Sequence, residues 1–181
     1  NTGALISTYT AEPLTALLIN SIAINAKGIT LGGVRSTDGG NSGVIINADL
    51  EGKFSKPIFL GVSDTSIDVV VLGTDSSVYA IGNSTETLAG KKVAGYRDGI
   101  LAKYSSTGKL SALVRSSAAK ARREWISATN SLFLTGSVQT GQKFESALTK
   151  FATNLSPTWT YRYSSTGATY SALGPSGSHF A

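Results

Sequence analysis

The stretch DGILAKYSSTGKL (residues 98–110) repeats the pattern of an earlier stretch, and this repetition predicts the fold. Gly99–Leu110 aligns without gaps on GVIINADLEGKF (Gly43–Phe54) at an offset of 56 residues. Both copies begin with Gly and two apolar residues and end with Gly, Lys and an apolar residue. A looser third copy, ALTKFATNLSPTW (Ala147–Trp159), repeats the Leu-x-Lys-aromatic element as LTKF. The chain therefore consists of about three related units.

A second element repeats independently of the first. VVVLGTDSSVYAIGNS (Val69–Ser84) resembles EWISATNSLFLTGSV (Glu124–Val138), and ALLINSIAINAKGITLGGV (Ala16–Val34) is a longer version. The glycines that close these elements, spaced by 50 and 54 residues, are Gly32, Gly82 and Gly136. A period of about 50 residues with about four strands per unit is typical of a propeller blade.

Short runs rich in Val, Ile, Tyr and Phe alternate with Gly, Asp and Asn turn signals, which is typical of antiparallel strands. One stretch differs: SSAAKARREW (Ser116–Trp125) favours a helix of one or two turns, because Ser caps helices and Ala, Lys, Arg and Glu favour them. The predicted fold class is all-β, a propeller-like array of about three four-stranded antiparallel blades, either alone or as part of a larger or oligomeric ring.

The segment SVYAIGNS…DGILAKYSSTGKL resembles the bacterial β-propeller repeat family with SBBP-like blades. The resemblance covers about Ile22–Tyr163 and is carried by Val78, Tyr79, Ile81, Gly82, Asp98, Ile100, Leu101, Lys103, Tyr104, Gly108 and Leu110, with Trp159 in the third copy. It implies a blade scaffold without a catalytic motif, in a protein that is exported or lies at the bacterial cell surface.

The expected organisation is a single β-repeat domain over residues 1–181. Its approximate units are 22–75, 76–130 and 131–173, and residues 1–21 supply a strand to a neighbouring or terminal blade. Because closed propellers have about four to eight blades, three explanations remain open. The chain is a piece of a longer protein, a self-contained open β-fold, or a subunit that pairs with copies of itself through exposed edge strands.

Composition narrows the function classes. The chain has no Cys and one His (His179), so neither a thiolate metal site nor a histidine-rich centre is expected, and no cofactor is predicted. The net charge is +5, but the basic residues are scattered, so nucleic acid is not an expected partner. The longest apolar run, Leu14–Ile24, is too short to span a bilayer. The chain lacks Met and starts at Asn1, so it is expected to be either a processed mature form or an excised part of a longer protein, with any signal peptide already removed.

The sequence contains no pattern that predicts catalysis. Most Asp residues lie in turns, where their side chains usually cap the backbone, and no G-x-S-x-G motif occurs. Asp64 and Asp68 are a weak indication of a glycan hydrolase or lyase. A calcium site could use the same two residues, or Asp38 with Asn41, but neither pair lies in the usual calcium-binding loop. The expected protein is not an enzyme.

Binding residues concentrate on loops held by rigid scaffolds, so the candidate site lies on the segments Arg35–Ser42, Asn83–Asp98 and Gln139–Glu145. Tyr and Arg are enriched at binding hot spots. The candidate ligand-binding residues are Arg35, Asp38, Asn41, Tyr96, Arg97 and Asp98. We expect an extracellular or cell-surface binding or scaffold module for a protein or glycan, or alternatively a structural subunit that assembles with copies of itself.

Overall fold

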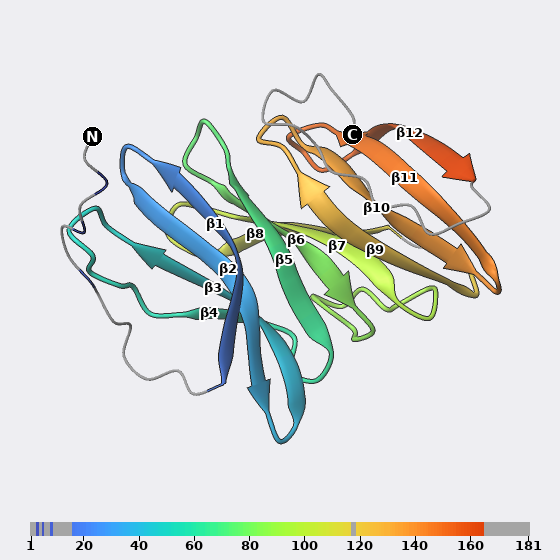
Figure 1. Ribbon diagram of the computed structural model, residues 1–181, viewed down its shortest axis with the longest axis horizontal. Coiled ribbons are helices and arrows are strands. Elements are labelled where there is room, and N and C mark those ends of the chain that lie inside the picture. Colours follow the sequence, from blue (N-terminus) through green and yellow to red (C-terminus); the bar gives the residue numbers. More distant parts are fainter. Residues whose placement is uncertain (1–2, 4, 6–7, 9–15, 117–118, 165–181) are drawn as a thin grey trace.

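The computed structural model describes residues 3, 5, 8, 16–116 and 119–164. These residues form an all-β structure of three four-stranded antiparallel sheets that follow one another along the long axis (Figure 1). Sheet I contains β1 (Leu17–Asn25), β2 (Gly28–Thr37), β3 (Gly40–Ala48) and β4 (Ile58–Leu60). Sheet II contains β5 (Thr65–Leu72), β6 (Val78–Ser84), β7 (Asp98–Tyr104) and β8 (Leu110–Ser116). Sheet III contains β9 (Ala121–Ala128), β10 (Phe133–Thr140), β11 (Lys143–Phe151) and β12 (Pro157–Ser164). The predicted fold class is confirmed.

The sheets stack face to face, and the middle sheet is covered on both sides. Alternate residues of β6 point to opposite faces: Val78 and Ala80 pack in the cluster between sheets I and II, whereas Tyr79 and Ile81 pack in the cluster between sheets II and III. Leu101, which the sequence places in a core, is fully buried in the second cluster. A strand buried on both faces must be apolar along its whole length, and this explains the unbroken apolar runs of sheet II.

The hairpin turns repeat with the same hydrogen bonds. In the third-to-fourth strand turn of each sheet, the residue that ends the turn has a positive φ: Gly52 (84°), Gly108 (82°) and Leu155 (66°). Its N–H donates to the carbonyl three residues earlier, as in Gly108 N to Ser105 O at 2.9 Å. This geometry is that of a type I turn followed by a left-handed residue. The YSSTG motif therefore closes a hairpin, as its Gly predicts.

A β-bulge repeats in the first strand of each sheet, opposite a glycine. The ladder shifts between Ile19 and Ser21, between Ile67 and Val69, and after Trp125. A Cβ added to the facing glycine would lie about 2 Å from a carbonyl oxygen of the first strand, so no other residue fits at Gly33, Gly82 or Gly136. The repeated glycine of sheet I is thus Gly33 and not the predicted Gly32, whose Cβ would meet the side chains of Val70 and Ile67.

The helix predicted over Ser116–Trp125 is wrong. Ser116 ends β8, and Ala121–Ala128 form β9, which pairs with β10. Burial in β9 alternates, with Arg123 and Trp125 buried and Arg122 and Ile126 exposed. Burying the indole of Trp125 between sheets II and III stabilises the strand far more than the small helix propensities of Ala, Lys and Arg favour a helix.

The first strands of the sheets lie next to one another. A cavity of about 350 Å³ is lined by residues of β1 and β5 together with Ala128 of β9 and Asn130. This is the arrangement expected when the first strand of each blade lies closest to a common axis. The repeat boundaries proposed at residues 75 and 130 fall between the first and second strands of a sheet, so the second and third sequence units begin one strand inside a sheet, whereas the first begins within β1.

Candidate functional site

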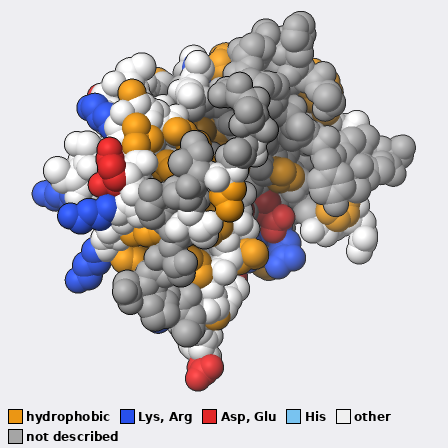
Figure 2. All heavy atoms as spheres, turned by 60° about the vertical axis from the view of Figure 1, so that its left-hand side comes forward, with side chains coloured by type: hydrophobic (Ala, Val, Ile, Leu, Met, Phe, Trp, Pro, Cys, Tyr) orange, Lys and Arg blue, Asp and Glu red, His pale blue; other side chains and the backbone are white. Residues whose placement is uncertain are grey.

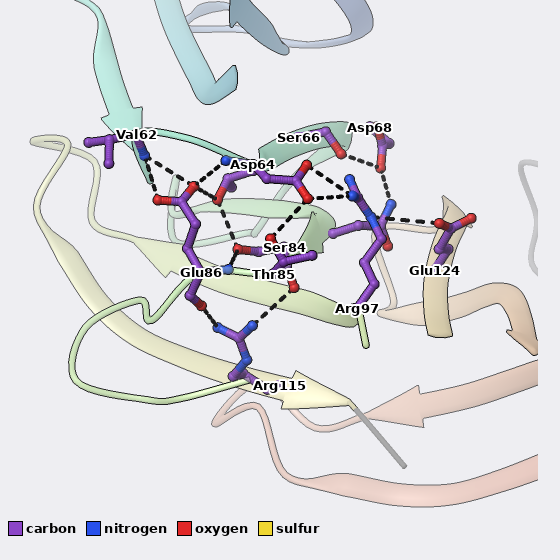
Figure 3. Close-up of polar contacts among 12 residues, drawn as sticks. Val62, Asp64, Ser66, Asp68, Ser84, Thr85, Glu86, Arg97, Arg115 and Glu124 are labelled. Atoms are coloured by element: carbon purple, nitrogen blue, oxygen red, sulfur yellow. Dashed lines mark hydrogen bonds and ion pairs between the residues drawn. The ribbon is translucent and has the colours of Figure 1, made fainter. Parts of the chain in front are cut away.

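The candidate site is the segment of residues 85–97, which connects β6 to β7 at one end of sheet II (Figure 3). It lies beside the start of β5 and the start of β9, because Arg97 forms a bridge with Arg122 and the Tyr96 N–H donates to Ala121 O at 2.7 Å. We call residues 85–97 the β6–β7 loop. It is the longest of the three segments in which the sequence predicts binding residues.

The β6–β7 loop is ordered by a small hairpin of its own. Leu88 and Lys91 exchange two backbone hydrogen bonds, of 3.1 and 2.9 Å, around Ala89 and Gly90. Both turn residues have positive φ angles, 48° and 75°, as a type I′ turn requires. The Leu88 side chain is buried in the cluster between sheets I and II, so the hairpin is anchored in the core.

A buried ion pair fastens both ends of the β6–β7 loop. Arg115 Nε donates to Asp98 Oδ2 at 2.8 Å, and the Asp98 side chain is completely buried. The Asp98 carboxylate also accepts the backbone N–H groups of Ala94 (3.0 Å) and Gly95 (3.1 Å). The remaining Arg115 nitrogens donate to the carbonyl oxygens of Ser84, Glu86 and Lys91. One pair of charges thus holds the loop at its entry, its hairpin and its exit.

Glu86 connects the same loop to the segment between sheets I and II. Its carboxylate accepts the N–H groups of Val62 (2.9 Å) and Asp64 (2.8 Å) and the Thr65 hydroxyl (2.8 Å). Burial alone would raise the pKa of Glu86, but the backbone N–H donors outweigh it and lower the pKa to about 2. Glu86 is therefore ionised over the whole physiological pH range and acts as a fixed acceptor.

Arg97 lies between the carboxylate of Asp64, just before β5, and that of Glu124 in β9. Its Nη1 donates to both oxygens of Asp64 at 2.9 Å, and its Nε lies 3.6 Å from Glu124 Oε1 (Figure 3). The Arg97 side chain is mostly buried, whereas Asp64 and Glu124 are partly exposed. Arg97 therefore ties sheet II to sheet III, and little of its guanidinium is available to a ligand.

Asp68, the bulge residue of β5, lies next to this site and has a raised pKa. Burial raises its pKa to about 6, although the Ser66 hydroxyl, Arg97 and the Asn83 amide oppose the shift. Asn83 Nδ2 donates to Asp68 Oδ2 at 2.6 Å, and the backbone N–H of Trp125 donates to Asn83 Oδ1 at 2.9 Å. The Asp68 carboxyl can exchange a proton near neutral pH next to a contact between two sheets.

The segments Arg35–Ser42 and Gln139–Glu145, which were expected as loops, belong to tight hairpins. Arg35 lies in β2 and Asn41 in β3, and only Asp38 and Gly39 separate these strands. β10 and β11 are likewise joined by a short turn between Thr140 and Lys143. The antiparallel pairing of both hairpins continues up to the two turn residues, so neither segment forms a long loop.

The structure brings Asn41 from sheet I near Arg97 of the β6–β7 loop, whereas Arg35 and Asp38 form no hydrogen bond or ion pair with this loop among the described residues. Asn41 forms a bridge with Asp64, the carboxylate that Arg97 binds, so Asn41 and Arg97 are brought to the same end of the molecule. Asp38 is exposed in its turn, and the guanidinium of Arg35 lies 5.1 Å from the ring of Phe59. Asp98 is buried and holds the loop, whereas Tyr96 is 66% exposed at the loop's surface.

The residues that sequence reasoning did not identify are the anchors Glu86 and Arg115, and the exposed Lys91 and Lys92. Lys91 and Lys92 flank the Ala89–Gly90 turn, and their adjacency within a Gly-bounded segment was a usable signal. Arg115 gives no such signal, because its partner Asp98 is distant in sequence.

A second concave region lies at the opposite end of sheets I and II. It has a volume of about 430 Å³ and its lining includes Lys27, Thr30, Asn47, Lys56, Ser76 and Thr107. Lys27 Nζ donates to Ser76 Oγ at 2.8 Å across the two sheets. None of the residues that the sequence selects as binding candidates lines this cavity.

Within the described residues there is no group of three or more His, Cys, Asp or Glu side chains that could hold a metal ion, and His179 lies outside them. The described part of the chain also has no helix long and apolar enough to cross a membrane. Comparison with protein-family models and with curated proteins found no match for this chain.

Proposed function

We propose that this chain is a non-catalytic binding or scaffold module of an exported or cell-surface bacterial protein, with a protein or glycan as its partner. The observation that carries the proposal is the fixed geometry of the β6–β7 loop. The buried Asp98–Arg115 pair, the Leu88 anchor and Glu86 hold its backbone, while Lys91, Lys92 and Tyr96 are exposed. The bacterial cell-surface assignment is supported by the resemblance of the repeats alone.

A fixed loop favours binding because the entropy of ordering it has already been lost on folding. Tyr96 offers a flat ring with a hydroxyl, and Lys91 and Lys92 offer two positive charges close by in the chain. Such a surface suits a partner that combines carboxylates or other acidic groups with apolar or sugar rings. The proposed partner class is therefore an acidic glycan or an acidic protein segment.

The test is binding of the chain to arrays of acidic and neutral glycans and of acidic and neutral peptides. The triple variant Lys91→Ser/Lys92→Ser/Tyr96→Ser should lose at least about 10-fold in affinity for the retained ligands, since each exposed contact contributes about 0.5–2 kcal/mol. The matched control Lys27→Ser/Lys56→Ser removes the same charge at the opposite end and should bind as the unchanged chain does. Equal loss in both variants would indicate charge alone, and release of glycan fragments would contradict a non-catalytic role.

A second candidate function, a structural subunit that assembles with copies of itself, is favoured by a separate observation. Large apolar side chains are exposed on the two end sheets, among them Ile22 and Ile24 of β1 and Tyr161 and Tyr163 of β12. Large apolar side chains that are exposed next to one another on an edge strand are typical of protein contacts.

A further inference from the structure

We propose that the cavity between sheets I and II, at the end opposite the β6–β7 loop, binds a small phosphorylated sugar or polyol. We call it the I–II cavity. Its volume is about 430 Å³, which lies in the range of about 300–1,000 Å³ found for small-molecule sites. It is lined by the turns that join β1 to β2, β5 to β6 and β7 to β8, together with the segment after β3. This site is separate from the proposed function, which concerns a larger partner at the β6–β7 loop.

A comparison of equivalent turns explains why this space is open. The β5–β6 and β9–β10 turns have the same hydrogen bond: Ser76 N donates to Gly73 O at 3.0 Å, and Leu132 N donates to Thr129 O at 2.8 Å. Ser76 and Leu132 also share a positive φ, of 62° and 57°. They are therefore equivalent positions. Leu132 is buried in the cluster between sheets II and III, whereas Ser76 lines the I–II cavity.

The second pair of turns repeats this difference. Gly108 and Leu155 end the β7–β8 and β11–β12 turns, with φ angles of 82° and 66°. Leu155 is buried between sheets II and III, whereas Gly108 lines the I–II cavity and has no side chain to fill it. Leucine rarely adopts a positive φ, because its Cβ crowds the following carbonyl. The chain thus has strained leucines at two turns that fill the contact between sheets II and III, and smaller residues at the equivalent turns facing sheet I.

Sheet I is also reduced at the positions that face this space. The cross-strand pair Thr30 with Asn47 in sheet I is equivalent to Tyr79 with Lys103 in sheet II, since Thr30 and Tyr79 each precede the bulge glycine of their strand by three residues. The Tyr79 ring is buried between sheets II and III, whereas Thr30 and Asn47 line the I–II cavity. Thr30 Oγ1 donates to Asn47 Oδ1 at 2.7 Å. Both sheets therefore leave room at this end, and one wall carries a buried polar pair.

The lining of the I–II cavity is polar and positively charged. Its other hydroxyl and amide side chains belong to Asn25, Ser55, Ser76, Ser106 and Thr107. Lys27 and Lys56 add two ammonium groups, and no Asp, Glu or aromatic residue is among the described residues of the lining. Lys27 Nζ donates to Ser76 Oγ at 2.8 Å, and neither lysine forms an ion pair with another described residue. Two cations without counter-charges at a polar cavity favour an anionic ligand.

The surroundings of sheet I favour the approach of an anion as well. In Figure 2, which brings the left-hand side of Figure 1 forward, Lys and Arg side chains gather along the left-hand side of the view, and acidic side chains are sparse there. A surface of one charge raises the local concentration of ligands of the opposite charge.

These groups select a ligand that combines a concentrated negative charge with several hydroxyls. A phosphate monoester carries about 1.5–2 negative charges near pH 7, so it can accept hydrogen bonds from both ammonium groups. Hydroxyl and amide side chains donate to and accept from sugar or polyol hydroxyls. A neutral sugar would leave both lysines without a counter-charge, and an aromatic ligand would find no ring in the described lining to stack on.

The test is isothermal titration calorimetry with glucose 6-phosphate, and with glucose and inorganic phosphate as separate probes. Glucose 6-phosphate should bind at least about 10-fold more tightly than either probe, because each of them makes only part of the contacts. Lys27→Ser/Lys56→Ser should weaken the binding of glucose 6-phosphate at least about 10-fold, as expected when charge-assisted hydrogen bonds are lost. Ser76→Leu introduces the residue of the equivalent β9–β10 turn, so it should fill the cavity and abolish binding.

The matched control is the triple variant of the β6–β7 loop, which removes two lysines at the opposite end and should bind glucose 6-phosphate as the unchanged chain does. Both cavity variants should fold, since Lys27 and Lys56 are exposed and Ser76 already has the φ at which the chain places Leu132. Circular dichroism checks this. In the unchanged chain, the ligand should shift the amide NMR signals of residues 27–30 and 106–108 and leave those of the β6–β7 loop in place.

Four results would overturn the proposal. They are no saturable binding of glucose 6-phosphate at millimolar concentration, equal binding by the unchanged chain and the folded cavity variants, NMR shifts outside the lining, and equal affinity for glucose or for inorganic phosphate. Equal affinity for inorganic phosphate would mean that the sugar is not recognised, and equal affinity for glucose would mean that the charge is not. None of these results bears on the β6–β7 loop, whose function is tested with larger ligands and its own variant.

Discussion

Removing the Asp98 charge should release the β6–β7 loop and destabilise the whole chain. In Asp98→Asn the shape of the side chain is kept, but one of the oxygens that accept Ala94 N–H, Gly95 N–H and Arg115 Nε is replaced by an NH₂ group. The Arg115 guanidinium then stays buried without its counter-charge. Removing one partner of a buried pair typically costs about 3–5 kcal/mol of unfolding free energy. For a chain of this size we expect the melting temperature to fall by about 6–20 °C.

A double-mutant cycle separates the ion pair from the other contacts of both residues. Arg115→Met leaves the carbonyl oxygens of Ser84, Glu86 and Lys91 without their guanidinium donors, so it should destabilise the chain to a similar extent. The combination Asp98→Asn/Arg115→Met should cost about 2 kcal/mol less than the sum of the single changes, because the pair is lost only once. The control is Lys143→Met, which removes the exposed Lys143 ammonium from Glu145 and should cost less than about 1 kcal/mol, because Glu145 keeps Arg162 as a partner at 3.6 Å.

Two assays check this prediction. Urea unfolding measures the global loss, and limited trypsin digestion reports whether the loop opens, since Lys91 and Lys92 are cleavage points within it. Faster cleavage at these lysines in Asp98→Asn than in a variant of equal global stability would locate the effect in the loop. The reasoning is refuted if the single changes are additive within about 0.5 kcal/mol, or if cleavage in the loop follows global unfolding alone.

Three further predictions concern the contacts between sheets. Gly99→Ala should destabilise the chain by about 1–3 kcal/mol, because the new Cβ would lie 2.6 Å from Nε1 of the buried Trp125. Gly39→Ala, whose Cβ would have only one neighbour, at 3.8 Å, should cost less than about 1 kcal/mol in the same thermal unfolding measurement. Asn83→Ala should lower the unfolding free energy measured in urea by about 1–3 kcal/mol, because it leaves the buried backbone N–H of Trp125 without its acceptor. An unchanged urea midpoint would contradict this. The pKa of Asp68 is raised from 3.8 to about 6, so the folded chain binds a proton that the unfolded chain releases, and the unfolding free energy should fall by about 1–3 kcal/mol as the pH rises from 4 to 6. Asp68→Asn should remove this fall in urea unfolding at pH 4, 5, 6 and 7, and an unchanged pH dependence would show that Asp68 does not cause it.

The architecture could be predicted from the sequence because its determinants are local and repeated. The turn of Tyr104–Gly108 needs a residue with positive φ at a fixed place, and the bulge of each first strand needs a glycine opposite it. Such requirements leave the same residue types at the same spacing, which a single sequence reveals. The repeated glycine of sheet I was placed one residue too early, since Gly32 and Gly33 are adjacent and only the backbone geometry distinguishes them.

The candidate site was predicted only in part, because its geometry depends on contacts between distant segments. Tyr96 and Arg97 are conspicuous as adjacent Tyr and Arg, and the structure places them in the β6–β7 loop. The anchors that give the loop its shape come from elsewhere: Arg115 from β8 reaches Asp98, and Glu86 reaches the segment before β5. Side chains separated by many residues cannot be matched by local spacing. The helix predicted over Ser116–Trp125 failed for a related reason, since long-range packing decided between two locally possible structures.

The same residue pattern is buried in one sheet and only half-buried in the next, and this limits what a repeat can reveal. Tyr79 with Lys103 and Phe133 with Lys150 occupy equivalent places, yet only the first pair is followed by another sheet in the described chain. A blade sequence therefore specifies which faces are apolar, whereas burial depends on a neighbour that the blade itself does not encode. If selection had acted on this chain as a monomer, the outer positions of β1 and β12 would gain solubility from polar residues without loss of internal packing. Their exposed Ile and Tyr residues are better explained by a protein surface that covers these two edge strands.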